Sequence, residues 1–178
     1  HIRCQADELR QRGHSVIVLT PRPRKTPEPA PPNVTFIGVS ARVRAQSSAV
    51  DVSAAVDQDE IDAFFERNHV DIVHFHEPVV PFVGRQLIAS CPYPTVATLH
   101  AALPDTGIGR SLGSITPYFR SVTQHVDVFT RVSPAVGAYL SELLAGHDIF
   151  GVPNGVELKS FHPSSAKRDP ATIVYLGR

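Results

Sequence analysis

The stretch from Val70 to Pro78 reads VDIVHFHEP and decides which fold this chain adopts. The part from Val70 to Phe75 is nearly continuous in Val, Ile and Phe, which is typical of a strand covered on both faces in a parallel sheet. The stretch then turns polar at His74, His76 and Glu77. Because side chains two residues apart lie on one face of a strand, His74 and His76 are predicted to face the same side.

Similar apolar runs recur on both sides of this stretch, separated by segments with helical periodicity. Strands that alternate with helices favour a parallel sheet with helices on both faces, so the predicted fold class is α/β and Rossmann-like. Strands are expected at Ser15–Thr20, Val34–Val39, Thr95–Leu99, Val126–Val132, Ile149–Val152 and Thr172–Leu176, and helices at Ile2–Arg12 (ended by Gly13), Asp57–Asn68, Phe82–Ser90, Thr116–His125 and from Ser133 onward; Ala41–Ser53 shows no clear pattern.

The composition narrows the class of protein. Of 178 residues, 42% are hydrophobic, which is enough for a buried core and argues against a disordered chain. Lys+Arg and Asp+Glu are both 17, and this formal net charge of +0 argues against a nucleic-acid partner, which requires a basic surface. No run approaches the ~20 apolar residues of a membrane-spanning helix. Met is absent, so we expect the chain to be a piece of a longer protein.

The two cysteines, Cys4 and Cys91, are far apart in the sequence and form no CxxC pair. They are too few for the disulfide framework of a small secreted fold. Reduced, buried thiols are the ordinary interpretation, and they predict a cytoplasmic protein.

In open parallel sheets, ligands bind beyond the carboxyl ends of the strands. His76 and Glu77 come at the end of one predicted strand, and His100 follows another. Three interpretations of the histidines remain open. Together with His74 and Glu77 they have the residue types of a zinc site, although without diagnostic spacing. They also suit acid–base chemistry or charge stabilisation, since His titrates near neutral pH. Alternatively, they bond only to neighbouring backbone.

The chain carries four short motifs in consecutive order: DIVHFHEP at 71–78, TLH at 98–100, VPNGVE at 152–157 followed by Phe161, and IVYLGR at 173–178. These motifs resemble those of glycosyltransferase family 4, a group of retaining enzymes with the two-domain GT-B fold. His1 is similar to the histidine that closes the family's glycine-rich entry. Within that family, the residues at 38–42, at 76–78 and at Pro117-Tyr118 resemble the phosphatidylinositol mannosyltransferases.

The resemblance implies which residues act. Glycosyl transfer would move a hexose, with mannose from GDP-mannose as the expected donor, to a sugar or lipid acceptor such as phosphatidylinositol. His100 would be the catalytic residue beside the transferred sugar. Gly177 and Arg178 would bind the donor diphosphate. The expected acceptor contacts are Arg42, His76 and Glu77. No cofactor or metal is implied.

The resemblance also implies a division of the chain. Residues 1–153 would be the N-terminal Rossmann-like domain without its first strand and glycine-rich loop. Residues 154–178 would be the interdomain linker and the first strand of a C-terminal donor-binding domain. A peripheral contact with the inner face of the plasma membrane is implied by the lipid acceptor. The alternative is a non-catalytic α/β binding module, or a degenerate relative that keeps only the fold.

Overall fold

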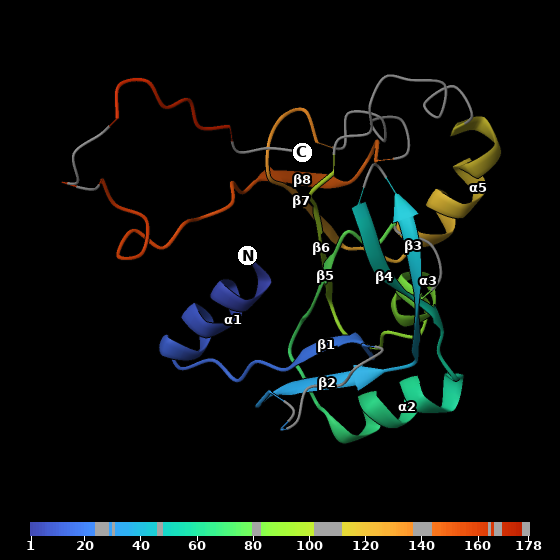
Figure 1. Cartoon of the computed structure of the whole chain (residues 1–178). Helices are drawn as coiled ribbons and strands as arrows, with labels where there is room; N and C mark the ends of the chain where they lie inside the picture. The colour runs from blue at the N-terminus through green and yellow to red at the C-terminus, as the bar shows by residue number, and fades with distance from the viewer. Residues whose placement is uncertain are drawn as a thin grey trace.

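The structure is a computed structural model, and it describes residues 1–23, 29, 31–45, 48–79, 83–101, 112–136, 144–163, 165 and 169–175, without the side chains of 41–45, 48–55 and 112–115. Helices and strands follow one another along most of this length (Figure 1). The elements are α1 (Ile2–Gln11), β1 (Val18–Pro21), β2 (Val34–Ile37), β3 (Val39–Ala45), β4 (Ser48–Ala55), α2 (Gln58–Arg67), β5 (Val73–His76), α3 (Val83–Ala89), β6 (Thr95–Leu99), α5 (Leu112–Thr123), β7 (Val128–Arg131) and β8 (Asp148–Gly151).

The central feature is a 4-stranded sheet of parallel strands in the order β5-β6-β7-β8. Helix α3 lies between β5 and β6 in the chain, and α5 lies between β6 and β7. This arrangement confirms the predicted α/β, Rossmann-like fold. At the amino ends of β6 and β7, the Asp127 carboxylate accepts from the Thr95 amide at 2.7 Å, and the Thr95 hydroxyl accepts from the Asp127 amide at 3.0 Å.

One face of this sheet packs on α3 and α5, and α1 lies on the other side (Figure 1). The packed face carries the alternate residues Ala97, Leu99 and Phe129, each with no exposed surface. Their helical partners include Ile88 of α3 and Val122 of α5, which are also buried. The strands therefore form a core by the period-two alternation expected of a sheet.

The N-terminal strands form separate, smaller sheets. β1 pairs with β2 in parallel, from Val18 opposite Val34 to Pro21 opposite Ile37. The predicted strand at 15–20 is therefore shorter and shifted, because pairing begins only at Val18. The predicted strand at 34–39 ends at Ile37, because Gly38 takes a positive φ of 60° that breaks the extended backbone.

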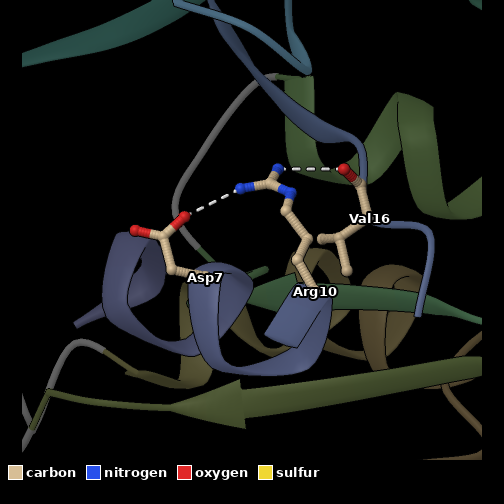
Figure 2. A network of polar contacts seen from close by, with 3 residues as sticks. All are labelled: Asp7, Arg10 and Val16. Atoms are coloured by element: carbon tan, nitrogen blue, oxygen red, sulfur yellow. Dashed lines mark hydrogen bonds and ion pairs between the residues drawn. The ribbon is translucent and has the colours of Figure 1, made fainter. Parts of the chain in front are cut away.

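Helix α1 ends as the sequence predicts. Gly13 has a φ of 91°, and the amides of Gly13 and His14 donate to the carbonyls of Arg10 and Leu9 at 3.0 and 3.1 Å, which is a Schellman C-cap. Arg10 then ties the helix to the segment before β1 (Figure 2). Its guanidinium donates to the Val16 carbonyl at 2.9 Å and pairs with the Asp7 carboxylate at 3.0 Å.

Strands β3 and β4 form an antiparallel pair, although the sequence at 41–53 shows no clear pattern. Helix α2 begins after Asp57, whose side chain accepts from the Asp59 amide at 3.2 Å, and it buries Ile61 and Phe65.

One predicted strand near the C-terminus is absent from the described residues, and one predicted helix there lies mostly outside them. Residues 172–175 are exposed and adopt no strand, because no neighbouring strand among the described residues pairs with them. The helix expected from Ser133 begins as a turn, with the Val136 amide bonded to the Ser133 carbonyl at 3.1 Å; residues 137–143 lie outside the described residues. Within the described ranges, no helix has the length and apolar character needed to cross a membrane.

Candidate functional site

The candidate site lies where β5 and β6 end, at the carboxyl edge of the four-stranded sheet. His76, the last residue of β5, pairs in register with Thr98 of β6. The chain then turns, and the Glu77 amide donates to the Thr98 carbonyl at 2.8 Å. His100 directly follows β6. Two adjacent parallel strands therefore bring His100 to His76 and Glu77, which precede it in the sequence by 24 and 23 residues.

Three imidazole rings form a stack at this edge. The ring centroids of His74 and His76 are 4.4 Å apart with an interplanar angle of 28°, which confirms that these side chains face the same side. His76 stacks in turn on His100, at 5.2 Å and 30°. Nδ1 of His76 lies 2.9 Å from Nε2 of His100. Two nitrogens so close share one proton, so one imidazole donates and the other accepts.

His1 approaches the same stack edge-on. Its ring centroid lies 5.5 Å from that of His100 and 6.1 Å from that of His76, with interplanar angles of 67° and 79°. This places the start of α1 against the candidate site, on the side of the sheet opposite α3 and α5 (Figure 1).

Burial is the largest influence on the charge of the stack. Burial, followed by the charges that His74, His100 and the N-terminus would carry, lowers the pKa of His76 to about 4. Burial, followed by the effect of His100, lowers the pKa of His74, and burial also lowers the pKa of His100. Near neutral pH the three rings are therefore uncharged. They can donate and accept hydrogen bonds, as the hydroxyl groups of a ligand require, but they supply no fixed positive charge.

Glu77 holds the backbone around His100. Its Oε2 accepts from the amide of His100 at 2.7 Å and from that of Ala101 at 2.9 Å. Glu77 itself has a positive φ of 52°, a conformation uncommon for a residue other than glycine. Burial raises the pKa of this carboxyl group, and the two amide bonds partly oppose that change. The carboxylate thus links the end of β5 to the loop after β6.

The other predicted site residues lie wholly or partly outside the described part of the chain. Arg42 lies in β3, opposite Asp51 of β4, and its side chain is outside the described residues. Gly177 and Arg178 are also outside them. Among the side chains that are described, no group of three or more His, Cys, Asp or Glu residues is arranged to hold a metal ion.

Two threonine hydroxyl groups that adjoin the histidine stack were not predicted from the sequence. Thr98 and Thr130 are register partners on β6 and β7, and their hydroxyls are 2.6 Å apart. The Thr98 hydroxyl also lies 2.6 Å from Nε2 of His74. By the alternation of each strand, Thr98 and Thr130 lie on the sheet face that carries His74 and His76, which is called the histidine face below. Only the register between β6 and β7 shows that their hydroxyls meet.

The chain is similar in sequence to bacterial phosphatidyl-myo-inositol mannosyltransferases. It is 25% identical over 191 residues to that of Mycolicibacterium smegmatis, which covers 100% of this chain and 46% of the relative. It is 26% identical over 193 residues to that of Mycobacterium tuberculosis strain H37Rv, which covers 100% of this chain and 47% of the relative. The chain spans about half the length of the curated relatives it matches.

The family model described as Glycosyltransferase Family 4 matches residues 1–160, which include the whole four-stranded sheet and the histidine cluster at its edge. This match covers most of the chain, including His74, His76, Glu77 and His100. The chain therefore belongs to glycosyltransferase family 4.

Proposed function

We propose that the complete protein is a retaining glycosyltransferase that transfers mannose from GDP-mannose to phosphatidylinositol or a related acceptor. Family membership supports glycosyl transfer, and similarity to bacterial phosphatidyl-myo-inositol mannosyltransferases supports the sugar and the acceptor. Within this protein the chain supplies the acceptor side of the cleft.

The observation that carries the proposal is the convergence of His76, Glu77 and His100 at the ends of two adjacent parallel strands. A neutral imidazole suits contact with sugar hydroxyls, because it can both donate and accept. We assign to His100 the role of orienting the transferred sugar by hydrogen bonds. The His100 amide donates to the Glu77 carboxylate, and this hydrogen bond fixes the backbone from which the His100 ring extends.

The charged groups of the reaction require cations that the histidine stack does not supply. A leaving diphosphate is stabilised by positive groups and amide donors aimed at its oxygens. We assign the donor diphosphate to Arg178 and the Gly177 amide, and the acceptor phosphate to Arg42. His76 and Glu77 would contact the acceptor from the strand end. Arginine suits phosphate because its planar guanidinium binds two oxygens at once.

We also propose that residues 1–153 form the N-terminal domain and that 154–178 lead into the donor-binding domain. The family match ends at residue 160, close to this boundary. Apolar side chains beyond it are highly exposed, among them Leu158 at 72%, Phe161 at 72% and Ile173 at 95%. Such a segment supports the proposal because a second domain would give these side chains a core to join.

The test uses the complete protein with a panel of nucleotide sugars and vesicles that contain phosphatidylinositol. The expected result is transfer from GDP-mannose, with retained configuration at the anomeric carbon of the product by NMR. A different preferred donor would replace the sugar assignment. The absence of transfer from every donor, with binding to the vesicles intact, would favour the non-catalytic binding module. The 178-residue chain by itself is expected to be inactive.

A further inference from the structure

The hydroxyl groups of Thr98 and Thr130 form a short chain that ends on the histidine stack. Thr98 is only 5% exposed, and its hydroxyl has close contacts with two polar atoms, Thr130 Oγ1 and His74 Nε2, each at 2.6 Å. A hydroxyl carries one hydrogen. Whichever partner Thr98 donates to, the other must donate to it, so the direction of the Thr98–Thr130 hydrogen bond decides whether Nε2 of His74 accepts or donates, and the contact restricts the orientation of the ring.

His74 does not reach His100 directly. Its ring stacks on that of His76, and His76 bonds to His100 through the Nδ1–Nε2 contact of 2.9 Å. The orientation of His74 can therefore influence the position of the His100 ring through the ring plane of His76.

We propose that His74 is a positioning residue for the transfer reaction, anchored by Thr98 and Thr130, which holds the plane of His76 so that its hydrogen bond to His100 is kept. The three rings and two hydroxyls act as one unit across β5, β6 and β7. The expected effect of His74 on sugar transfer rests on the proposed function. Its expected effect on the His76–His100 hydrogen bond does not.

The experiment compares Thr98→Val with Thr123→Val in the complete protein. Valine matches the shape of threonine but lacks the hydroxyl. Thr123, on α5, is 2% exposed and serves as an equally buried control away from the histidines. The first readout is the ¹⁵N–¹⁵N coupling across the His76–His100 hydrogen bond in histidine-labelled protein. The second is kcat and the donor KM, measured separately.

The expected result is that Thr98→Val loses the ¹⁵N–¹⁵N coupling and about tenfold in kcat, with the donor KM nearly unchanged, because misplaced groups slow the reaction without weakening donor binding. Thr123→Val is expected to keep both. An unchanged coupling in folded Thr98→Val would overturn the proposal, and so would a loss of kcat with the coupling intact.

A second variant covers the case in which Thr98→Val does not fold. His74→Phe keeps an aromatic ring for stacking on His76 but has no nitrogen to contact Thr98. It is expected to lose the coupling as well, because the ring is no longer anchored. A coupling as strong as in the wild-type protein would show that stacking alone holds His76, and the anchoring role would be rejected. If the wild-type protein transfers no sugar, the proposed function fails, while the coupling still decides the positioning role.

Discussion

The two faces of the four-stranded sheet are built from the same strands but differ in role: one packs against helices to form the core, and the other carries the histidine stack. On one face, Leu99 and Phe129 are fully buried against α3 and α5. On the other, the Thr98 hydroxyl contacts Nε2 of His74, and Nδ1 of His76 contacts Nε2 of His100 at the strand ends. Adjacent residues of a strand point to opposite faces, so a single position separates a core residue from a site residue. The core face should govern stability, and the histidine face should govern activity.

The largest effect is expected from Phe129→Ala on the core face. Phe129 has no exposed surface, and removing its ring leaves a cavity, so the free energy of unfolding should fall by about 3–5 kcal/mol. Urea unfolding followed by circular dichroism measures this. Phe150→Ala on β8 is the matched control, because that ring is 55% exposed. Equal losses for both variants would contradict the assignment of the core to one face.

A smaller effect is expected from Glu77→Ala, at the turn that directly follows β5. The change removes the carboxylate that accepts from the amides of His100 and Ala101, so the free energy of unfolding should fall by about 1–3 kcal/mol. Glu77→Gln keeps an acceptor oxygen and should recover part of the loss, and Glu66→Ala on the surface of α2 should cost little. If Glu77→Ala is as stable as the wild-type protein, the carboxylate does not hold this loop.

The histidine face also predicts a pH dependence of stability. The pKa of His76 is lowered from 6.5 to about 4 by burial and then by His74 and His100, so the unfolded chain binds a proton in this range that the folded chain does not. Stability should therefore fall as the pH drops through this window. The expected loss is on the order of 1–2 kcal/mol after solvent screening of a partly exposed group.

Urea unfolding at a series of pH values, with His76→Phe as the comparison, isolates this contribution. The lowered pKa values of His74 and His100 act in the same direction, whereas the raised pKa of Glu77 favours the folded state on acidification. His76→Phe should weaken the dependence between pH 6.5 and about 4. An unchanged slope in this variant would mean that His76 is not held neutral by the fold.

The strands of the central sheet could be predicted because their apolar runs are continuous. The strand at Thr95–Leu99 has the predicted bounds, and the prediction that His74 and His76 share a face is confirmed. The pairing of β3 with β4 could not be predicted, because Ser and Ala fill much of both strands and the intervening residues 46–47 carry no glycine turn signal. The run at 172–176 has the right composition for a strand, but a strand also requires a neighbour.

The residues of the site could be predicted in part. The rule for strand ends in parallel sheets points to His76, Glu77 and His100, and the structure brings them together. The anchor formed by Thr98 and Thr130 could not be predicted, because threonine is ordinary in strands and the contact depends on the register between β6 and β7. The role of Glu77 in bonding two backbone amides likewise depends on its positive φ, which its residue type does not suggest.

The central claim, that the histidine face serves activity rather than stability, is tested most directly by His100→Ala in the complete protein. Unfolding and mannose transfer are measured on the same preparation. The account predicts a free energy of unfolding within about 1 kcal/mol of the wild type and a fall in kcat of at least about 100-fold, or ~2.7 kcal/mol of transition-state stabilisation. Wild-type transfer by a folded His100→Ala protein would contradict it.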